Sequence, residues 1–287
     1  MLVLGGMAAR PAADADPLRD AGVAAPLRVE AVKAAAKKSG SSSVKALVEA
    51  MRACGTCPAA RDLGRVLAEW DEAELQAAGT PEFLVEVARG KDPEPLRAAA
   101  VQAFNRVPAG KRPAGTQDLE LVKVKVTCVP AQMRYDPKEF TVAGGRWVEI
   151  EMNNPDSLQH NLLVVMPGAL AEIGLAGDKL GETAEGKARQ FVPDSPKVLH
   201  VMGLIDPGGT GRLAFKAPEK VGTYPFVCTY PSHWRMMNGK MKVTAPEAGS
   251  AAPAAGSAAP AAGGTAPAGA APGPGGAAPL SKSAAPA

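Results

Sequence analysis

The chain has 287 residues, of which 46% are hydrophobic and 21% are charged, and its formal net charge is +3. This length leaves room for two modest domains, and this composition is ordinary for a soluble protein. The sequence shows no basic stretch with interleaved aromatic residues, as in nucleic-acid binding, and no apolar run near the ~20 residues that span a bilayer.

The N-terminal segment, residues 1–16, is rich in alanine and aspartate and is expected to be a disordered leader. Its first nine residues are apolar but few, and no basic region precedes them, so they do not make a complete secretory signal. Three explanations stay open at this point. The export signal is missing, the chain is the C-terminal piece of a longer one, or the protein is cytoplasmic.

Residues 17–109 are dominated by residues that favour helices. Serines at 41–43 offer an N-cap for a helix with apolar residues at i, i+3, i+4 and i+7, namely Val44, Leu47, Val48 and Met51. Further helices are predicted to begin near Pro81, Pro93 and Pro95. Segments 26–35 and 95–104 are similar to each other, with a weaker copy at 58–63. This region therefore resembles a short HEAT-like array of helix pairs, and an ordinary alanine-rich bundle is the alternative.

Cys54 and Cys57 form a Cys-x-x-Cys pair within the helical region. Pro58 stands where haem attachment needs a histidine, and no nearby cysteine or histidine completes a zinc site. A thioredoxin-like role needs a βαβ context that this region lacks. We predict a local disulfide or two reduced thiols.

Residues 110–117 read as a linker, because glycine, proline and threonine break the helical pattern. A β domain is predicted to follow at 118–243, since apolar and polar residues alternate at 121–126, 139–142, 147–152, 197–202 and 211–216. A helix or flap with glycine interruptions is expected at 168–187. Cys128 is expected to end the first strand as a buried thiol. Residues 244–287 are mostly alanine, proline, glycine and serine, which predicts a disordered tail.

The densest set of metal-binding side chains follows a predicted strand at 222–227. Soft or borderline donors of the kind that suits copper fall within ten residues there: Cys228, His233, Met236 and Met237. A trigonal copper site of two histidines and one cysteine needs a second imidazole from elsewhere. His160 follows a polar turn and precedes an apolar run, so it is the expected donor. His200 lies inside a strand-like run and is interpreted as structural or surface-facing.

The spacing of these residues is specific. Cys228, His233 and Met237 follow a Cys-x4-His-x3-Met pattern, and Gln159-His160-Asn161 supplies an upstream His-Asn. Together they resemble the azurin/auracyanin-like cupredoxins, which are type 1 blue copper proteins. The resemblance implies a mainly β Greek-key sandwich or barrel. It also implies one Cu(II)/Cu(I) ion held by His160, Cys228, His233 and axial Met237.

Other roles follow from the same resemblance. Asn161 is expected to tie the two ligand segments together. Gln159 stands where azurins carry a glycine, so its carbonyl makes a fifth copper contact only if the backbone permits. Met236 competes with Met237, which the family spacing favours. His233 is expected to form an electron exit, while Trp234 either joins the docking patch or packs inward. With Cys128 the only other cysteine of the β domain, the disulfide of azurins is expected to be missing.

The resemblance implies an electron carrier, not an enzyme, that exchanges single electrons with redox proteins such as c-type cytochromes. It also implies a periplasmic or otherwise extracytoplasmic location. Three alternatives stay open. The chain is an electron-relay fragment of a larger extracytoplasmic oxidoreductase, a copper storage or delivery protein, or a scaffold whose helical region binds a protein partner.

Overall fold

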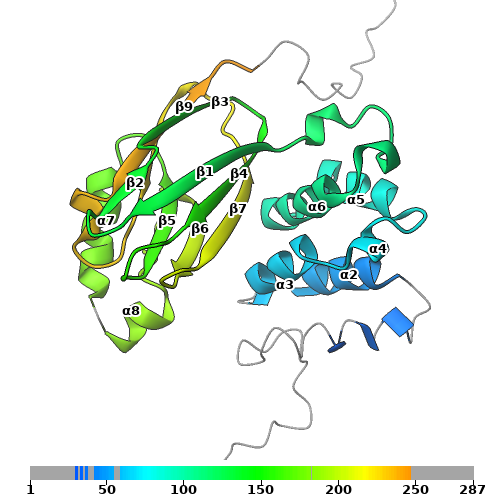
Figure 1. Ribbon diagram of the computed structural model, residues 1–287, viewed down its shortest axis with the longest axis horizontal. Helices are drawn as coiled ribbons and strands as arrows, with labels where there is room; N and C mark the ends of the chain where they lie inside the picture. The colour runs from blue at the N-terminus through cyan, green and yellow to red at the C-terminus, as the bar shows by residue number, and fades with distance from the viewer. Residues whose placement is uncertain are drawn as a thin grey trace, which may run out of the picture. The chain divides into compact units, whose positions relative to one another are not determined.

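The structure is a computed structural model that describes residues 30–31, 33–34, 36–37, 42–54, 59–181 and 183–246 (Figure 1). Side chains of residues 54 and 59–63 are not described. The predictions for the leader, for the Cys54–Cys57 pair and for the tail beyond residue 246 therefore lie outside the described part of the chain. Within that part, no helix is both long and apolar enough to cross a bilayer.

Helices occupy the described chain from residue 43 to residue 106: α2 (Ser43–Cys54), α3 (Ala59–Ala68), α4 (Glu72–Leu75), α5 (Thr80–Arg89) and α6 (Glu94–Arg106). The Ser42 hydroxyl accepts a hydrogen bond from the Lys45 amide at 3.3 Å and so caps α2. Proline stands in the first turn of both α5 and α6, where its missing N–H costs nothing. The predicted helical N-terminal region is confirmed, and its HEAT-like arrangement stays a prediction.

The helices share one apolar core. The four residues predicted on one face of α2 are all buried, together with Leu84, Val101 and Phe104 from α5 and α6. The predicted linker contains two 3-10 turns, η1 (Ala109–Lys111) and η2 (Gln117–Leu119). This segment is tied to the helices, because Leu119 is buried in their core and Asp118 pairs with Arg89 at 2.5 Å. The domain boundary there stays a prediction.

The remaining described chain forms nine strands: β1 (Val122–Val129), β2 (Arg134–Asp136), β3 (Glu139–Ala143), β4 (Trp147–Asn153), β5 (His160–Val165), β6 (Val198–Ile205), β7 (Thr210–Lys216), β8 (Gly222–Val227) and β9 (Asn238–Thr244). They make one sheet of order β2-β1-β4-β7 and another of order β3-β9-β8-β5-β6. Both sheets are mixed, since β1–β4 and β3–β9 pair in parallel and the other neighbours are antiparallel. The predicted β fold is thereby confirmed.

Two details of the strands differ from expectation. β1 continues to Val129, so Cys128 lies within the strand instead of ending it, and it is fully buried. β2 was not predicted, because a three-residue strand with one inward side chain, Tyr135, is too short to show a periodicity.

The predicted helix or flap is two helices between β5 and β6, α7 (Leu170–Leu180) and α8 (Ala184–Ala188). Ile173 of α7 is buried against Leu163, Val165 and Val227, which belong to β5 and β8. Helix α7 thus packs on β5, which begins with His160, and on β8, which ends just before Cys228.

Helix α6 contacts the first sheet within the same compact unit. Trp147 of β4 belongs to the apolar core of the helices, and the Arg97 guanidinium lies 5.5 Å from its ring centroid. The Gln102 amide donates to Glu149 of β4 at 2.8 Å. Buried apolar area and a cation–π contact therefore join α6 to the sheet.

Candidate metal centre

The histidines and the cysteine of the predicted site come from the start of one strand and from the loop that follows its paired strand. His160 is the first residue of β5, and Cys228 directly follows β8. β5 and β8 pair antiparallel, with Leu163 opposite Val227, so the start of one strand lies beside the end of the other. His233 begins the 3-10 turn η3 (His233–Arg235) in the loop between β8 and β9. Sheet pairing therefore brings together residues that are far apart in the sequence.

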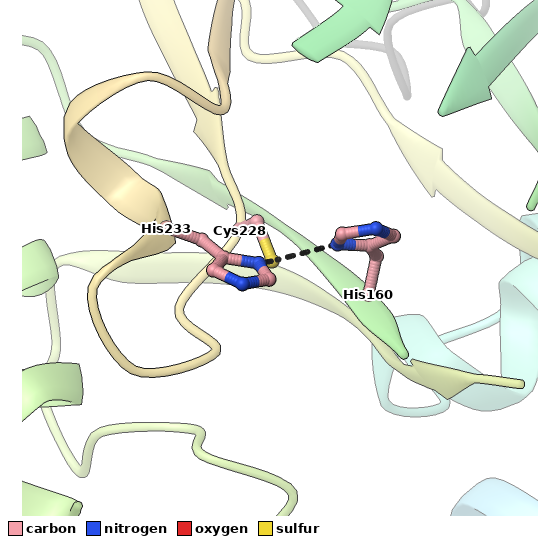
Figure 2. A group of neighbouring side chains, drawn as sticks. All are labelled: His160, Cys228 and His233. Carbon is pink, nitrogen blue, oxygen red and sulfur yellow. Dashed lines mark hydrogen bonds between the residues drawn. The ribbon is translucent and has the colours of Figure 1, made fainter. Parts of the chain in front are cut away.

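The three side chains converge on a buried point. The Cys228 Sγ lies 3.8 Å from His160 Nδ1 and 3.7 Å from His233 Nδ1. All three donor atoms lie within 4.8 Å of one another. Figure 2 shows the two imidazole rings on either side of the sulfur. His160 and Cys228 are fully buried, and His233 is 3% exposed.

These distances fit a metal held between the donors. Nitrogen and sulfur ligands about 2.1 and 2.3 Å from one ion, as for zinc, lie about 3.8 Å apart in a trigonal arrangement. The observed separations of 3.7 and 3.8 Å match that spacing without movement of either strand. Two imidazoles and one thiolate are the donor set of blue copper sites.

Burial sets the protonation of these groups. It lowers the pKa of His233 to about 4, and it lowers the pKa of His160 despite the nearby Asp156 carboxylate. Both imidazoles are therefore neutral near pH 7 and keep a lone pair for a metal. Burial raises the pKa of the Cys228 thiol to about 11, although hydrogen bonds from Asn161 and Tyr230 favour the thiolate. A bound cation must therefore displace the thiol proton.

Asn161 connects the two segments that carry the donors, as predicted. Its amide donates to the Thr229 hydroxyl and to the Gln190 carbonyl, each at 2.9 Å, and accepts from the Thr229 N–H at 2.8 Å. The Tyr135 hydroxyl donates to the Asn161 carbonyl at 2.5 Å. All polar groups of the buried Asn161 side chain are thus used to fix β5 against the loop after β8.

Comparison with known proteins agrees with this geometry. The family model described as "Copper binding proteins, plastocyanin/azurin family" matches residues 122–244. Auracyanin-A of Chloroflexus aurantiacus is 29% identical over 124 residues, which is 42% of this chain and 74% of that protein. Auracyanin-B of the same organism is 25% identical over 154 residues, 53% of this chain and 63% of that protein, so the chain spans less than two thirds of it.

Two solved structures were also found to be similar. One is Auracyanin A, a "blue" copper protein from Chloroflexus aurantiacus, with 29% identity, a TM-score of 0.40, and coverage of 44% of this chain and 100% of that one. The other is dithionite-reduced auracyanin from Roseiflexus castenholzii, with 29% identity, a TM-score of 0.38, and coverage of 42% of this chain and 96% of that one.

Residues 122–244 form a cupredoxin domain. The family match and the buried donor set together indicate a single type 1 copper ion as its cofactor.

The ligand loop of the cupredoxin domain distinguishes its two methionines. Met237 is fully buried in the same core as Cys228, whereas Met236 is 62% exposed. The Met237 carbonyl accepts from the Cys228 N–H at 3.0 Å, and the Met237 N–H donates to the His233 carbonyl at 2.8 Å. Ser232, with φ of +68°, makes the turn between Cys228 and His233. The loop thus closes on itself with Met237 on the inner side.

Trp234 packs against α7, and a part in docking stays a prediction. Its indole N–H donates to Asp178 of α7 at 2.8 Å, and its ring belongs to the apolar cluster around Ile173. Because His233 is 3% exposed, the predicted solvent-facing edge of its ring is narrow.

The other predicted residues lie around the site. The Gln159 amide donates to Asp206 at 2.6 Å, and Gln159 is not among the described residues with positive φ. Its backbone thus has a conformation that any residue can adopt, and whether its carbonyl makes a fifth copper contact stays open. His200 is outside the donor cluster and stacks on Phe215 with ring centroids 4.3 Å apart, as expected of a structural histidine.

Sequence reasoning missed two carboxylates beside the site. Asp156 Oδ2 lies 3.2 Å from His160 Nε2, and Asp178 contacts the ligand loop from α7. An aspartate four residues before a candidate histidine was the available signal for Asp156. No local pattern points to Asp178, because helix packing places it.

Proposed function

We propose that the protein is a one-electron carrier in which copper alternates between Cu(II) and Cu(I). The observation that carries this proposal is the buried cluster of two imidazole nitrogens and one cysteine sulfur. Type 1 copper supplies one-electron redox chemistry with little change in its surroundings. The protein's part is to hold the ligands still and to keep water away.

His160, Cys228 and His233 would hold the copper, and Met237 would be a weaker fourth ligand. Cys228 provides the thiolate and the strongest bond. The hydrogen bonds of Asn161 and the closed loop keep the donors in place, which limits their movement when the charge changes. Burial of all four side chains excludes water.

Burial of the donors also favours electron transfer over copper storage or delivery. A delivery protein must pass the ion to another set of ligands, and here the donors are at most 3% exposed. The same burial argues for a carrier rather than an enzyme, since a substrate would have to displace packed side chains. An electron-relay fragment of a larger oxidoreductase would use the same site.

We place the docking surface around exposed Met236, which adjoins the buried Met237. Residues of the ligand loop and of the β1–β2–β3 segment line a concave surface of about 530 Å³ there: Gln132, Arg134, Lys138, Arg235, Met236 and Asn238. Three of these six are basic and none is acidic, and one of the three, Arg235, is paired with Asp178 of α7 at 3.0 Å. A redox protein with an acidic rim, such as a c-type cytochrome, would be attracted to this surface. The compartment consistent with this role is the periplasm or another extracytoplasmic space.

The test is to add Cu(II) to the purified full chain and record its visible and EPR spectra, beside Cys228→Ser and Cys128→Ala. An intense blue band with a small copper hyperfine splitting is expected for the original chain and for Cys128→Ala, because Cys128 packs in the same core as Cys228 but is not one of the clustered donors. The band should disappear in Cys228→Ser. A colourless complex or an ordinary tetragonal EPR signal in the original chain would refute the proposal.

A further inference from the structure

A buried carboxylate contacts one of the two imidazoles. Asp156 lies in the loop between β4 and β5 and is 5% exposed. Its Oδ2 atom is 3.2 Å from Nε2 of His160, which is fully buried. On the other side of the ring, His160 Nδ1 faces the Cys228 sulfur at 3.8 Å. The imidazole thus stands between the carboxylate and the copper site.

The loop holds Asp156 firmly in this position. Its other oxygen, Oδ1, accepts from the Ser157 N–H at 2.7 Å, from the Ala131 N–H at 3.3 Å and from the Ser157 hydroxyl at 3.4 Å. The buried Asn154 amide donates to the Leu158 and Ile205 carbonyls and accepts from the Asp156 N–H. These hydrogen bonds hold the carboxylate in place, and turning it away would break its contacts with Ser157, Ala131 and His160.

The carboxylate is ionised at neutral pH. Its Oδ1 atom accepts from the backbone N–H groups of Ser157 and Ala131, and hydrogen bonds of this kind favour the charged form of a carboxylate. An ionised carboxylate only accepts hydrogen bonds, so the proton of the neutral imidazole must be on Nε2. The lone pair is then on Nδ1, the atom that faces Cys228.

The geometry points to Asp156 as a positioning residue that fixes the tautomer of His160 and, through its charge, favours the oxidised copper site. This inference rests on the proposed function. A carboxylate bonded to the distal N–H of a metal-binding imidazole raises the basicity of that ligand. A more basic ligand and a nearby negative charge both stabilise Cu(II) more than Cu(I). Asp156 thus lowers the tendency of the site to accept an electron.

The experiment is a redox titration of the copper-loaded full chain, followed at the blue band, for the original chain, Asp156→Asn and Asp206→Asn. Asparagine keeps the shape of Asp156 and removes its charge. Asp206 is a matched control because it is exposed and bonds to Gln159, the neighbour of His160, without contacting the imidazole. Each variant therefore loses one negative charge near His160, Asp156→Asn from the β4–β5 loop and Asp206→Asn from the β6–β7 loop.

In Asp156→Asn, we expect the Cu(II)/Cu(I) ratio at a fixed solution potential to fall about tenfold, which for one electron corresponds to a rise of ~59 mV in reduction potential. Asp206→Asn should change the ratio much less, because its charge is exposed to water and screened. Equal shifts in the two variants, or no shift in Asp156→Asn, would show that Asp156 only shapes the loop and would overturn the inference.

A second readout does not depend on the variant folding or on the blue colour. Long-range proton–nitrogen NMR of the original full chain, without copper and again with Cu(I), reports which nitrogen of His160 carries the proton. We expect Nε2 in both states. A proton on Nδ1 would overturn the role of Asp156 even if the copper site is blue. Conversely, a proton on Nε2 in a chain that gives no blue band would refute the proposed function while supporting the role of Asp156 in setting the tautomer.

Discussion

Asn161 is the single residue that most directly joins the halves of the site. Its side chain makes two hydrogen bonds to Thr229 and one to the Gln190 carbonyl, and it has no exposed surface. Truncation would leave the buried Thr229 N–H without its acceptor as well as removing the link between β5 and the ligand loop. An unpaired buried donor costs about 1–3 kcal/mol.

Asn161→Ala should therefore lower the free energy of unfolding of the copper-free chain by about 2–4 kcal/mol. Urea unfolding measures this change. Asn153→Ala is the control, because Asn153 is exposed at the end of β4 and its side chain has one long contact, 3.4 Å, to Thr210. Its effect should stay within about 0.5 kcal/mol. Similar losses for the two variants would mean that Asn161 is not a structural tie.

At the residue scale, the proposed metal ligands could be predicted from the sequence, but the residues that position them could not. Cys228, His233 and Met237 lie on one loop, so their spacing along the chain reflects their spacing in space. His160 could be inferred because the chain has only three histidines and one of them, His200, sits within a strand pattern. The Asp156–His160 contact depends on how the loop around Asn154 folds back, and no spacing rule gives that. The direction of Trp234 depended on a helix from another part of the chain.

At the scale of elements, helix α7 holds the ligand loop in place. The Asp178 carboxylate accepts from the Ser232 N–H at 2.7 Å, the Trp234 indole at 2.8 Å and the Arg235 guanidinium at 3.0 Å. Ser232 and Trp234 flank His233 on both sides. The helix thereby restrains the position of one proposed ligand without touching it.

Asp178→Ala should make the loop looser and copper easier to remove. The predicted result is about tenfold faster loss of the blue band under a chelator. Asp194→Ala offers the same change of charge at an exposed position for which no side-chain hydrogen bond is recorded among the described residues. Equal rates of copper loss in the two variants would show that Asp178 does not restrain the ligand loop.

The glycines of α7 allow close packing without ending the helix. The sequence predicts a helix or flap with glycine interruptions at 168–187, and α7 runs continuously from Leu170 to Leu180 through Gly174 and Gly177. A Cβ at Gly174 would overlap the Trp234 ring, and one at Gly177 would lie 2.9 Å from the Thr229 carbonyl oxygen. These glycines therefore allow close packing of the helix on the ligand loop. Local propensity cannot distinguish a glycine that breaks a helix from one that lets a neighbour approach.

At the scale of the whole molecule, His200 lies where the helical region meets the β domain. Its ring stacks on Phe215 of β7, and its Nδ1 is 3.6 Å from the Glu94 carboxylate of α6. Burial lowers the pKa of His200 to about 4. The Glu94 side chain is 42% exposed, so water weakens its opposing effect on the imidazole.

The pKa of His200 predicts how stability depends on pH. In the unfolded chain this histidine takes up a proton near its ordinary pKa, about 6.5. The folded chain resists that proton until pH falls to about 4. The unfolded state therefore binds more protons between these values, and stability present above the higher pKa is lost as pH falls through this window.

The measurement is urea unfolding of the copper-free chain and of His200→Gln at about pH 7 and about pH 4.5. The original chain should lose about 2 kcal/mol more than the variant between these conditions. Subtracting the loss of unfolding free energy of the variant from that of the original chain removes the contribution of the carboxylates that both chains share. An equal loss would show that His200 is protonated in the folded chain, paired with Glu94.

The strand order of the second sheet determines when the site can assemble as the chain is made. β9 is the last strand in the sequence, yet it lies between β3 and β8, with Lys240 opposite Glu139. Until β9 has been synthesised, β3 has no neighbour in its sheet and the loop that carries His233 and Met237 has only one anchored end. Pairing of such distant segments is slow compared with local helix formation. The ligands are therefore expected to come together late, because a nascent chain without β9 lacks the strand that anchors the far end of the ligand loop.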